Sequence, residues 1–273
     1  MGHPLAESSR RGSKGIFPPD LALSDNGPVR EMDRRTMLGA IAIAILAAAS
    51  GVAAAGAAPL RWKLPLEKVP APVGVLTRLP GNGNQMALTV DDGDSVAVVG
   101  AFAQFCRDSG TRLTFFVNGV NSSWSVNAPA LRPMVDSGQI QMGNHTWSHP
   151  YLNRIGLSAV ADQFRRNADF LRNTYGVDGT PYWRPPYGVH NADIDRVAAD
   201  QGYTTVTMWS GDVGDSVPES PDSLVAHASK SFQPQQIVLM HANLPEVTHC
   251  YPQLLDLIQS RNLQTVTLND VFT

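Results

Sequence analysis

Two histidines at a spacing of four are the residues of this chain best suited to hold a metal ion. They occur in the sequence GNHTWSHP at positions 143–150, directly after an apolar run. Side chains at i and i+4 lie about 5–6 Å apart on one face, and two imidazoles so placed can bind one zinc ion at about 2.0–2.1 Å each. Taken alone, His145 and His149 could equally be surface or core histidines, because histidine is commonly only partly buried.

A pair of adjacent aspartates strengthens the case for a metal. Asp91 and Asp92 also follow an apolar run, and a lone histidine, His241, ends another. Adjacent carboxylates in an extended strand point to opposite sides, but in a turn one could bind metal while the other stays free. Three protein ligands, an open position and a nearby base are what metal-assisted hydrolysis needs. The alternative is a turn or helix-capping pair before Ser95. A peptidase of the HExxH type is disfavoured because position 146 is threonine.

From residue 84 onward, apolar runs alternate with helix-like segments. The apolar runs are Met86–Val90, Leu113–Val117, Ile140–Met142, Tyr182–Trp183, Thr204–Met208, Ile237–Met240 and Thr265–Leu268. The helix-like segments are Ser95–Ser109, Ser158–Tyr175, Asn191–Gln201, Asp222–Phe232 and Glu246–Ser260. Several of these segments are followed by glycine, which readily takes the left-handed conformation at a helix end.

This alternation predicts an α/β fold with a parallel sheet. The runs are apolar at consecutive positions, so both faces of the sheet should be covered. We expect a closed or nearly closed β/α barrel, with an open doubly wound sheet as the alternative. The chemically capable residues then lie at the carboxyl ends of strands, where parallel α/β folds carry their sites. They are Asp91, Asp92, Asn118, His145, His149, Arg184, Trp209, Asp212, Asp215 and His241.

Five short motifs in this order resemble those of the polysaccharide deacetylase family, which is carbohydrate esterase family 4 or the NodB homology domain. LTVDDG at 88–93 resembles the first motif, TFDDG, HTWSH at 145–149 matches H-[ST]-x-x-H, and RPPYG at 184–188 matches R-x-P-Y-G. WSGDVGD at 209–215 resembles the fourth, Asp-containing motif, and LMH at 239–241 matches L-x-H. The resemblance covers residues 84–273 and implies a distorted (β/α)7–8 barrel with a single catalytic domain.

The resemblance also implies one divalent metal, with zinc expected, and a role for each motif residue. Asp92, His145 and His149 would bind the metal. Asp91 would be the general base that takes a proton from water, and Arg184 would orient it. This division matches the two functions that the adjacent aspartates could share.

The later motifs would supply the general acid and the substrate contacts. His241 would protonate the leaving amine, and Asp215 would tune His241. The backbone N–H of Tyr187 would help to hold the oxyanion of an attacked acetyl carbonyl. Tyr187, Trp209 and Leu239 would contact the substrate, which is expected to be an acetylated polysaccharide.

The sequence departs from the family in two places. Asp94 stands where the first motif usually continues with proline, which adds a third carboxylate near the metal. Ser216 stands where the fourth motif usually has tryptophan, which removes part of the apolar wall around the acetyl group. Trp183 or Trp209 could compensate, or both could be ordinary barrel packing, because aromatic residues are mostly core.

The N-terminal region is expected to direct export. Residues 1–31 are rich in Gly, Pro, Ser and charge, which indicates a disordered leader or a stretch upstream of a true start at Met32. Arg34-Arg35, the Ala-rich run 39–58 and small residues before Pro59 are typical of a cleaved twin-arginine signal. The alternative is an uncleaved membrane anchor. The Pro-rich stretch that follows is predicted to be a linker or lead-in, so we divide the chain into 1–58, 59–83 and 84–273.

The composition is that of a globular protein. The chain has 273 residues, of which 43% are hydrophobic and 16% charged. A net charge of -3 and the lack of a basic run after residue 60 argue against a nucleic-acid partner. Cys106 and Cys250 have no CxxC spacing, so we expect two buried thiols or, in an exported protein, a disulfide. The sequence indicates no particular oligomeric state.

Three functions remain open at this stage. The first is a metal-dependent N-deacetylase of a GlcNAc-containing polysaccharide, such as peptidoglycan or a chitin-like chain. The second is an O-acetyl esterase, for example on acetylxylan. The third is a barrel that binds glycan without turnover, which the complete set of base, ligands and acid disfavours.

Overall fold

The computed structural model describes residues 66–273. The leader, the twin-arginine signal and residues 59–65 lie outside the described residues, so the predictions on them stay predictions. Among the described helices, none combines the length and the apolar character needed to cross a membrane.

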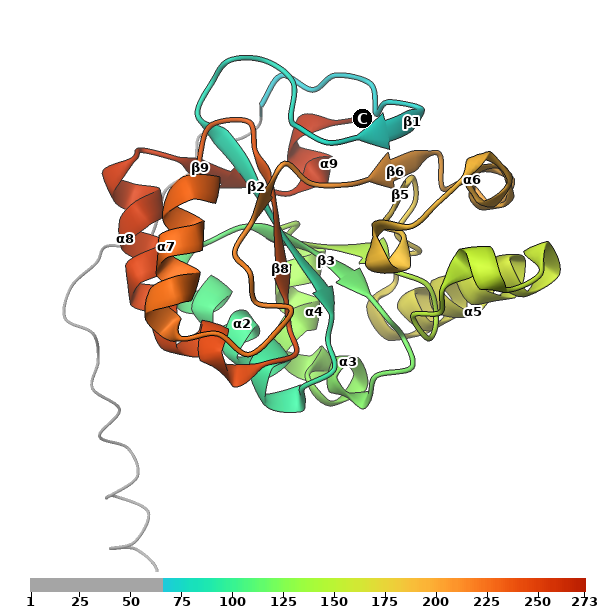
Figure 1. Cartoon of the computed structure of the whole chain (residues 1–273), viewed down its shortest axis with the longest axis horizontal. Coiled ribbons are helices and arrows are strands. Elements are labelled where there is room, and N and C mark those ends of the chain that lie inside the picture. The colour runs from blue at the N-terminus through green and yellow to red at the C-terminus, as the bar shows by residue number, and fades with distance from the viewer. Residues whose placement is uncertain (1–65) are drawn as a thin grey trace, which may run out of the picture. The chain divides into compact units, whose positions relative to one another are not determined.

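Nine strands form one curled sheet in which every pairing is parallel (Figure 1). The strand order is β1-β6-β5-β4-β3-β2-β8-β7, and β9 pairs with the beginning of β2. The strands are β1 Gly74–Leu76, β2 Gln85–Asp92, β3 Leu113–Val117, β4 Ile140–Asn144, β5 Tyr182–Trp183, β6 Thr205–Thr207, β7 Gly211–Asp212, β8 Ile237–His241 and β9 Gln264–Val266. Over residues 66–273, no ladder joins β1 to β7, so the barrel is open at that seam. This agrees with the distorted barrel that the family resemblance implies.

Helices that lie between the strands in the sequence cover the outside of the sheet (Figure 1). The helices are α2 Val96–Ser109, α3 Ser122–Val126, α4 Ala128–Asp136, α5 Leu157–Tyr175, α6 Ala192–Ala199, α7 Pro221–Ser231, α8 Tyr251–Ser260 and α9 Leu268–Val271, with 3-10 turns η1 Leu152–Arg154, η2 Pro186–Gly188 and η3 Pro245–Cys250. By contrast, α9 follows the last strand and contributes Leu268 and Val271 to a different core cluster. Ser95 caps α2 by accepting from the Val98 N–H, and Gly110 ends it with φ of 73°. These are the boundaries predicted from the sequence.

The strands are buried on both faces, which explains their continuous apolar character. All five residues of β3 are buried. On β8, Val238 and Met240 pack into the outer core beneath the helices. Leu239 and His241 alternate with them and therefore face the barrel interior. Strand alternation thus directs Leu239 and His241 to one side of the sheet.

The described part of the predicted linker belongs to the barrel. Gly74–Leu76 forms β1 and pairs with β6, and the side chains of Leu76 and Leu79 are 6% and 5% exposed in the inner core. The boundary at residue 84 is therefore too late. Prolines around a short edge strand hid it, because proline is tolerated at sheet edges and is also typical of linkers.

Two smaller expectations are resolved by the structure. Cys106 and Cys250 are both free and buried, so the thiol alternative holds and the disulfide does not. The apolar run expected to end at Leu268 stops as a strand at Val266. Thr267 there forms a capping box with Asp270 and begins α9.

Candidate active site

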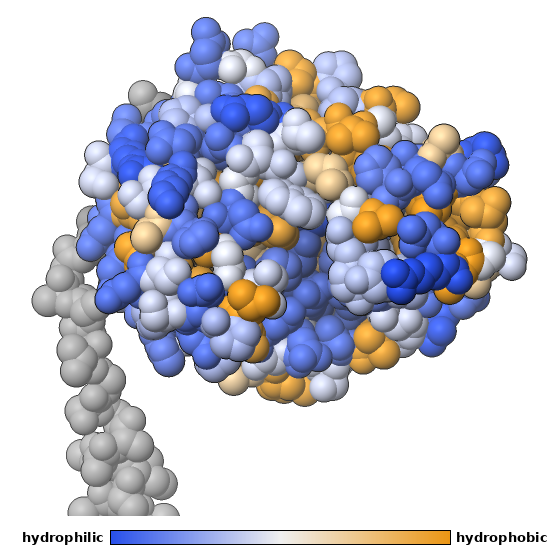
Figure 2. Space-filling model, viewed as in Figure 1, coloured by the Kyte–Doolittle hydropathy of each residue, from blue (hydrophilic) through white to orange (hydrophobic). Residues whose placement is uncertain are grey.

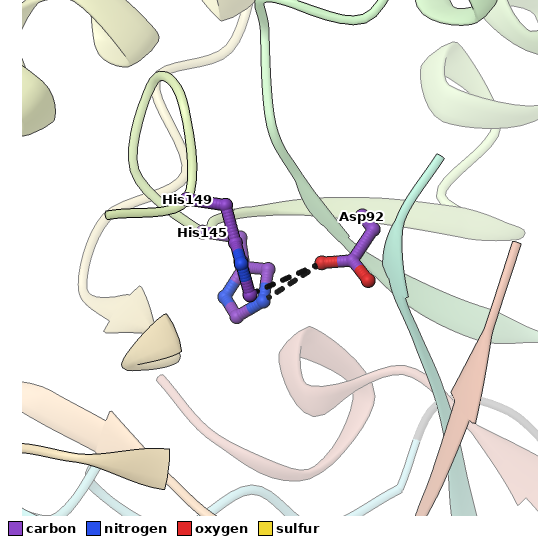
Figure 3. Close-up of side chains that lie close together, drawn as sticks. All are labelled: Asp92, His145 and His149. Carbon is purple, nitrogen blue, oxygen red and sulfur yellow. Dashed lines mark ion pairs between the residues drawn. The ribbon is translucent and has the colours of Figure 1, made fainter. Parts of the chain in front are cut away.

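Three side chains from two strand ends converge at the carboxyl edge of the sheet. Asp92 ends β2, and His145 and His149 lie in the loop after β4. Asp92 Oδ1 lies 3.2 Å from His145 Nε2 and 3.4 Å from His149 Nε2. Figure 3 shows both imidazoles directed toward the same carboxylate oxygen. The space-filling surface is hollowed near these strand ends, and mostly hydrophilic residues line the hollow (Figure 2).

The three side chains fit a divalent cation. Tetrahedral zinc with bonds of about 2.0–2.1 Å separates its ligand atoms by about 3.3 Å, and the Asp92 Oδ1 distances of 3.2 and 3.4 Å match this. Asp92 Oδ1 is buried without a hydrogen-bond partner, which is costly unless a cation fills that role. One ligand atom from each residue lies within 4.8 Å of the others.

Hydrogen bonds and charge prepare the ligands. The Nδ1 of His145 lies 2.7 Å from the carbonyl oxygen of Arg184, so Nδ1–H donates there and Nε2 is the nitrogen that faces Asp92 and could bind a metal. Burial would raise the pKa of Asp92, but the imidazoles of His145 and His149 hold it well below its usual range. Burial and the neighbouring His145 lower the pKa of His149 to about 4. Burial opposes protonation of His145 as well, yet Asp91 and Asp92 raise its pKa.

Asp91 faces the same centre. Arg184 binds one of its carboxylate oxygens, and the other oxygen is directed toward the histidines. Asp91 Oδ1 accepts a 2.7 Å hydrogen bond from Arg184 Nη1, and Asp91 Oδ2 lies 3.7 Å from His145 Nε2. Arg184 is fully buried and is fixed by further bonds to Thr89 Oγ1 and the Thr207 carbonyl. Both aspartates reach one centre because Asp92 has a left-handed φ of 69°, which breaks the strand alternation.

His241 and Asp215 form a second ionisable pair at this edge. His241 is paired in register with Asp91 across β2 and β8. Its Nδ1 lies 2.9 Å from Asp215 Oδ1, and its backbone N–H donates to Asp215 Oδ2 at 2.8 Å. Burial opposes protonation, but the hydrogen bond to Asp215 prevails and raises the pKa of His241 to about 9. A histidine that keeps its proton at neutral pH is suited to act as an acid.

The residues expected to contact substrate are placed differently from one another. Tyr187 is 52% exposed, and its ring centroid lies 4.4 Å from that of His149. Trp209 lies over the Arg184 guanidinium, with 5.6 Å from the ring centroid to Cζ. Leu239 is two residues before His241 and on the same face of β8. Trp183 is fully buried among Phe164 and its neighbours in a separate core cluster, so it is packing and does not line this centre.

The two departures from the family lie on exposed loops. Asp94 has an exposed side chain, and its backbone N–H donates to Asn243 Oδ1 at 3.1 Å. Ser216 is exposed beside Val217, which is 55% exposed.

Several supporting residues were not found from the sequence. Asn243 Nδ2 donates to Asp92 Oδ2 at 2.7 Å, which leaves Oδ1 to the histidines. Asn121 Nδ2 and Trp124 Nε1 donate to the Asp92 carbonyl at 3.1 and 3.0 Å. A Cβ at Gly93 would come within 2.3 Å of the Trp124 ring, so that position requires glycine. The only sequence signal for Asn243 and Asn121 is that they are polar and follow a strand, as Asn118 does. That signal does not identify the groups with which they form hydrogen bonds.

Asn167 of α5 supports the histidine loop from below. Its Nδ2 donates to the Val117 carbonyl and to Asn144 Oδ1, both at 2.8 Å, and its Oδ1 accepts from the Gly119 N–H. Asn144 Oδ1 in turn accepts from the Thr146 N–H at 2.8 Å. Asn167 is completely buried. A fully satisfied buried network of this kind rigidifies the loops that it joins.

Unfavourable backbone conformations are concentrated around this centre. Six of the described non-glycine residues have positive φ, and four of them are Asp92, Thr146, His149 and Tyr187. Each such residue costs about 1–3 kcal/mol, and such residues cluster at functional sites.

A cavity of ≈ 800 Å³ lies elsewhere, beside Arg112 and Gly138 near the starting ends of the strands. None of the predicted site residues lines this cavity.

Comparisons with known proteins identify the family. The family model for polysaccharide deacetylase matches residues 79–206. A chitooligosaccharide deacetylase from Bradyrhizobium is 30% identical over 159 residues, which are 58% of this chain and 70% of that protein. The chain belongs to the polysaccharide deacetylase family. A peptidoglycan-N-acetylglucosamine deacetylase from Bacillus cereus is 24% identical over 197 residues, covering 71% of this chain and 70% of the relative.

The fold is shared with solved members of the polysaccharide deacetylase family. A family 4 carbohydrate esterase from Streptomyces lividans in complex with acetate has a TM-score of 0.59 at 27% identity, covering 67% of this chain and 91% of that one. The predicted family and distorted barrel are thereby confirmed. Polysaccharide deacetylases are hydrolases of carbon–nitrogen bonds other than peptide bonds, and most of the related proteins are active while some are pseudoenzymes, which confirms the predicted enzyme class. Its enzymes use a divalent metal.

Proposed function

We propose that this protein removes N-acetyl groups from a GlcNAc-containing polysaccharide and releases acetate and a free amine. The observation that carries the proposal is one centre where Asp92 Oδ1 lies 3.2 and 3.4 Å from two imidazole nitrogens. Asp91, the proposed base, and His241, the proposed acid, occupy paired positions on β2 and β8 beside that centre.

Asp92, His145 and His149 would hold the metal. When bound, a divalent cation supplies Lewis-acid chemistry, which polarises the acetyl carbonyl and makes a water molecule more acidic. One carboxylate and two imidazoles are a common ligand set for catalytic zinc, which leaves a fourth position open. We therefore propose zinc as the resident metal, bound one per chain.

Asp91 would take the proton from the attacking water. Its Oδ2 is directed toward the ligand centre, while Oδ1 is fixed by Arg184 Nη1 at 2.7 Å. Because Arg184 is buried and bonded to Thr89 and Thr207 as well, it holds the carboxylate in one orientation. The backbone N–H of Tyr187 would donate to the oxyanion as the carbonyl carbon becomes tetrahedral.

His241 would give its proton to the leaving nitrogen. An amine leaves poorly unless it is protonated, so the acid is essential for amide hydrolysis. Asp215 keeps His241 protonated by accepting at Nδ1 and fixes its backbone through the 2.8 Å bond from the His241 N–H. Leu239 and Trp209 would line the acetyl group from the interior face of the barrel.

An O-acetyl esterase is the second candidate, because ester hydrolysis would use the same centre. The raised pKa of His241, about 9, favours the amide, since an alkoxide depends less on protonation than an amine does. A barrel that binds glycan without turnover is the third candidate, and Asp94 and Ser216 are the departures that keep it open.

An acetate-release panel separates these candidates. Purified protein is incubated with chitooligosaccharides, peptidoglycan and acetylated xylan, each with and without a chelator. The proposal expects acetate from one of the N-acetylated substrates and none after chelation. Release from xylan alone would favour the esterase, and no release from any substrate would favour the binding protein.

We further propose that the protein is exported by a cleaved twin-arginine signal, with an uncleaved membrane anchor as the alternative. The catalytic domain would comprise the predicted residues 84–273 together with the strand that precedes them. N-terminal sequencing of the mature protein tests this, because cleavage near Ala58 is expected and an intact leader would contradict it.

A further inference from the structure

A column of stacked side chains runs outward from the ligand centre. The ring of Tyr187 lies edge-on to His149, with centroids 4.4 Å apart and planes at 61°. Its partner on the outside is the ring of Tyr151, which is nearly parallel at 9° and 3.8 Å away. The guanidinium of Arg154 covers Tyr151, with Cζ 4.2 Å from the ring centroid. We call these four side chains the ring column.

Both inner members of the ring column have backbones that need support. His149 has φ of 56° and Tyr187 has φ of 59°, a region that side chains with a Cβ rarely adopt. The turn around Tyr187 is closed locally by the Gly188 N–H to the Pro185 carbonyl at 3.0 Å. Tyr187 as a residue is 52% exposed, so it gains little support from core packing.

The outer members are anchored to the barrel through a neighbouring residue. Tyr151 precedes η1 and Arg154 is its last residue. The Arg154 N–H donates to the Tyr151 carbonyl at 2.9 Å. Between them, Leu152 is 1% exposed and packs in the core cluster that contains Phe164. Leu152 therefore fixes the turn. Tyr151 is 37% exposed, and its ring stacks on that of Tyr187.

We propose that Tyr151 is a positioning residue for the deacetylation reaction, acting through the Tyr187 ring. Held between Tyr151 and His149, the Tyr187 ring fixes the direction of its own backbone N–H and limits rotation of the His149 imidazole. Arg154 closes the outer end of the column by a cation–π contact. This inference rests on the proposed function for the roles of Tyr187 and His149, and it predicts that an aromatic residue is needed at 151.

The test compares Tyr151→Ala with Tyr151→Phe, which keeps the flat ring. Because loss of a whole oxyanion donor costs about 10²–10³ in rate, imperfect alignment in Tyr151→Ala should lower kcat about tenfold. KM for a short chitooligosaccharide should stay near that of the wild type. The zinc Kd of the apoprotein, measured by competition with a chelating dye, should weaken by up to about tenfold because His149 is less constrained. Tyr151→Phe should restore both values.

Controls separate positioning from general damage. Leu157→Ala removes a side chain of similar exposure, 42%, outside the ring column, and should change neither kcat nor zinc Kd. If Tyr151→Ala does not fold, Tyr151→Leu keeps the volume without the flat face and takes its place. Wild-type kcat and zinc Kd in the Ala or Leu variant, or equal losses in Tyr151→Phe, would overturn the inference. If the wild type releases no acetate, the proposed function fails, while the zinc measurements still decide whether the column constrains His149.

Discussion

At the scale of single residues, the two neighbouring aspartates contact different partners. Asp92 presents Oδ1 to two imidazoles and Oδ2 to Asn243. Asp91 presents Oδ1 to Arg184 and leaves Oδ2 toward the centre. The left-handed backbone at Asp92 is what allows both to face inward. Their functions can therefore be separated by substitution.

Replacing the base should stop turnover without removing the metal. Asp91→Asn keeps the size of the side chain but cannot accept the proton of water, and general base catalysis typically contributes about 10²–10⁴ in rate. We expect kcat for acetate release to fall by at least about a hundredfold, with zinc content unchanged by elemental analysis. Asp94→Asn, which removes a nearby exposed carboxylate, is the matched control. Wild-type turnover in Asp91→Asn would show that the base is another group.

The acid should set the alkaline limit of activity. A general acid works only while protonated, so activity is present below its pKa and is lost as pH rises through it. Asp215 raises the pKa of His241 to about 9, and Asp215→Asn removes that negative charge and lowers the pKa. The alkaline limb of the kcat/KM profile should therefore move to lower pH in Asp215→Asn. An unmoved limb in a folded, zinc-loaded variant would assign it to a different group.

At the scale of elements, α5 does more than cover the sheet. Through Asn167 it joins the loop after β3 to the loop after β4, which carries both histidines. Val117 and Asn144 are the last residues of β3 and β4, and Gly119 lies in the turn after β3. The helix is therefore a support for the ligand loop as well as a packing element.

Removing the Asn167 amide should weaken both the fold and the site. Asn167→Ala removes three buried hydrogen bonds. The Gly119 N–H loses its partner, which costs about 1–3 kcal/mol, while the Val117 carbonyl and Asn144 Oδ1 still accept from the His145 and Thr146 N–H groups. We expect the free energy of unfolding to fall by about 2–4 kcal/mol, measured by urea denaturation, and the zinc Kd to rise. Asn173→Ala, on an exposed position of the same helix, should change little. Equal effects in both variants would contradict a special role for Asn167.

The elements also show what local patterns could and could not predict. Apolar runs predicted β3, and the glycines that follow α2 and α5 predicted where those helices end, because these signals lie within or beside the segment itself. The short strands β1 and β7 were missed, since they depend on pairing with β6 and β8 far along the chain. The same distinction holds in the site. Residue type and position after a strand pointed to Asp92, His145 and His149 as candidate ligands, and their side chains lie together in the structure. The contact of Asn243 with Asp92, 151 positions apart, has no local signal.

At the scale of the whole described domain, one edge of the sheet gathers residues from positions 91 to 241. Parallel pairing places Asp91 beside His241 and puts the ends of β2, β3 and β4 in neighbouring positions. The helices and the inner core hold these strand ends. The candidate ligands are Asp92 at the end of β2 and His145 and His149 in the loop after β4. The proposed deacetylation therefore depends on a single cation bound at that edge.

Zinc titration of the apoprotein by calorimetry tests this dependence most directly. We expect one tight site per chain in the wild type and in Asp91→Asn. We also expect loss of that site in Asp92→Ala and in His149→Ala, while both variants remain folded by circular dichroism. A wild-type protein that binds no zinc or other divalent cation, or an Asp92→Ala variant that binds zinc as tightly as the wild type, would contradict this dependence.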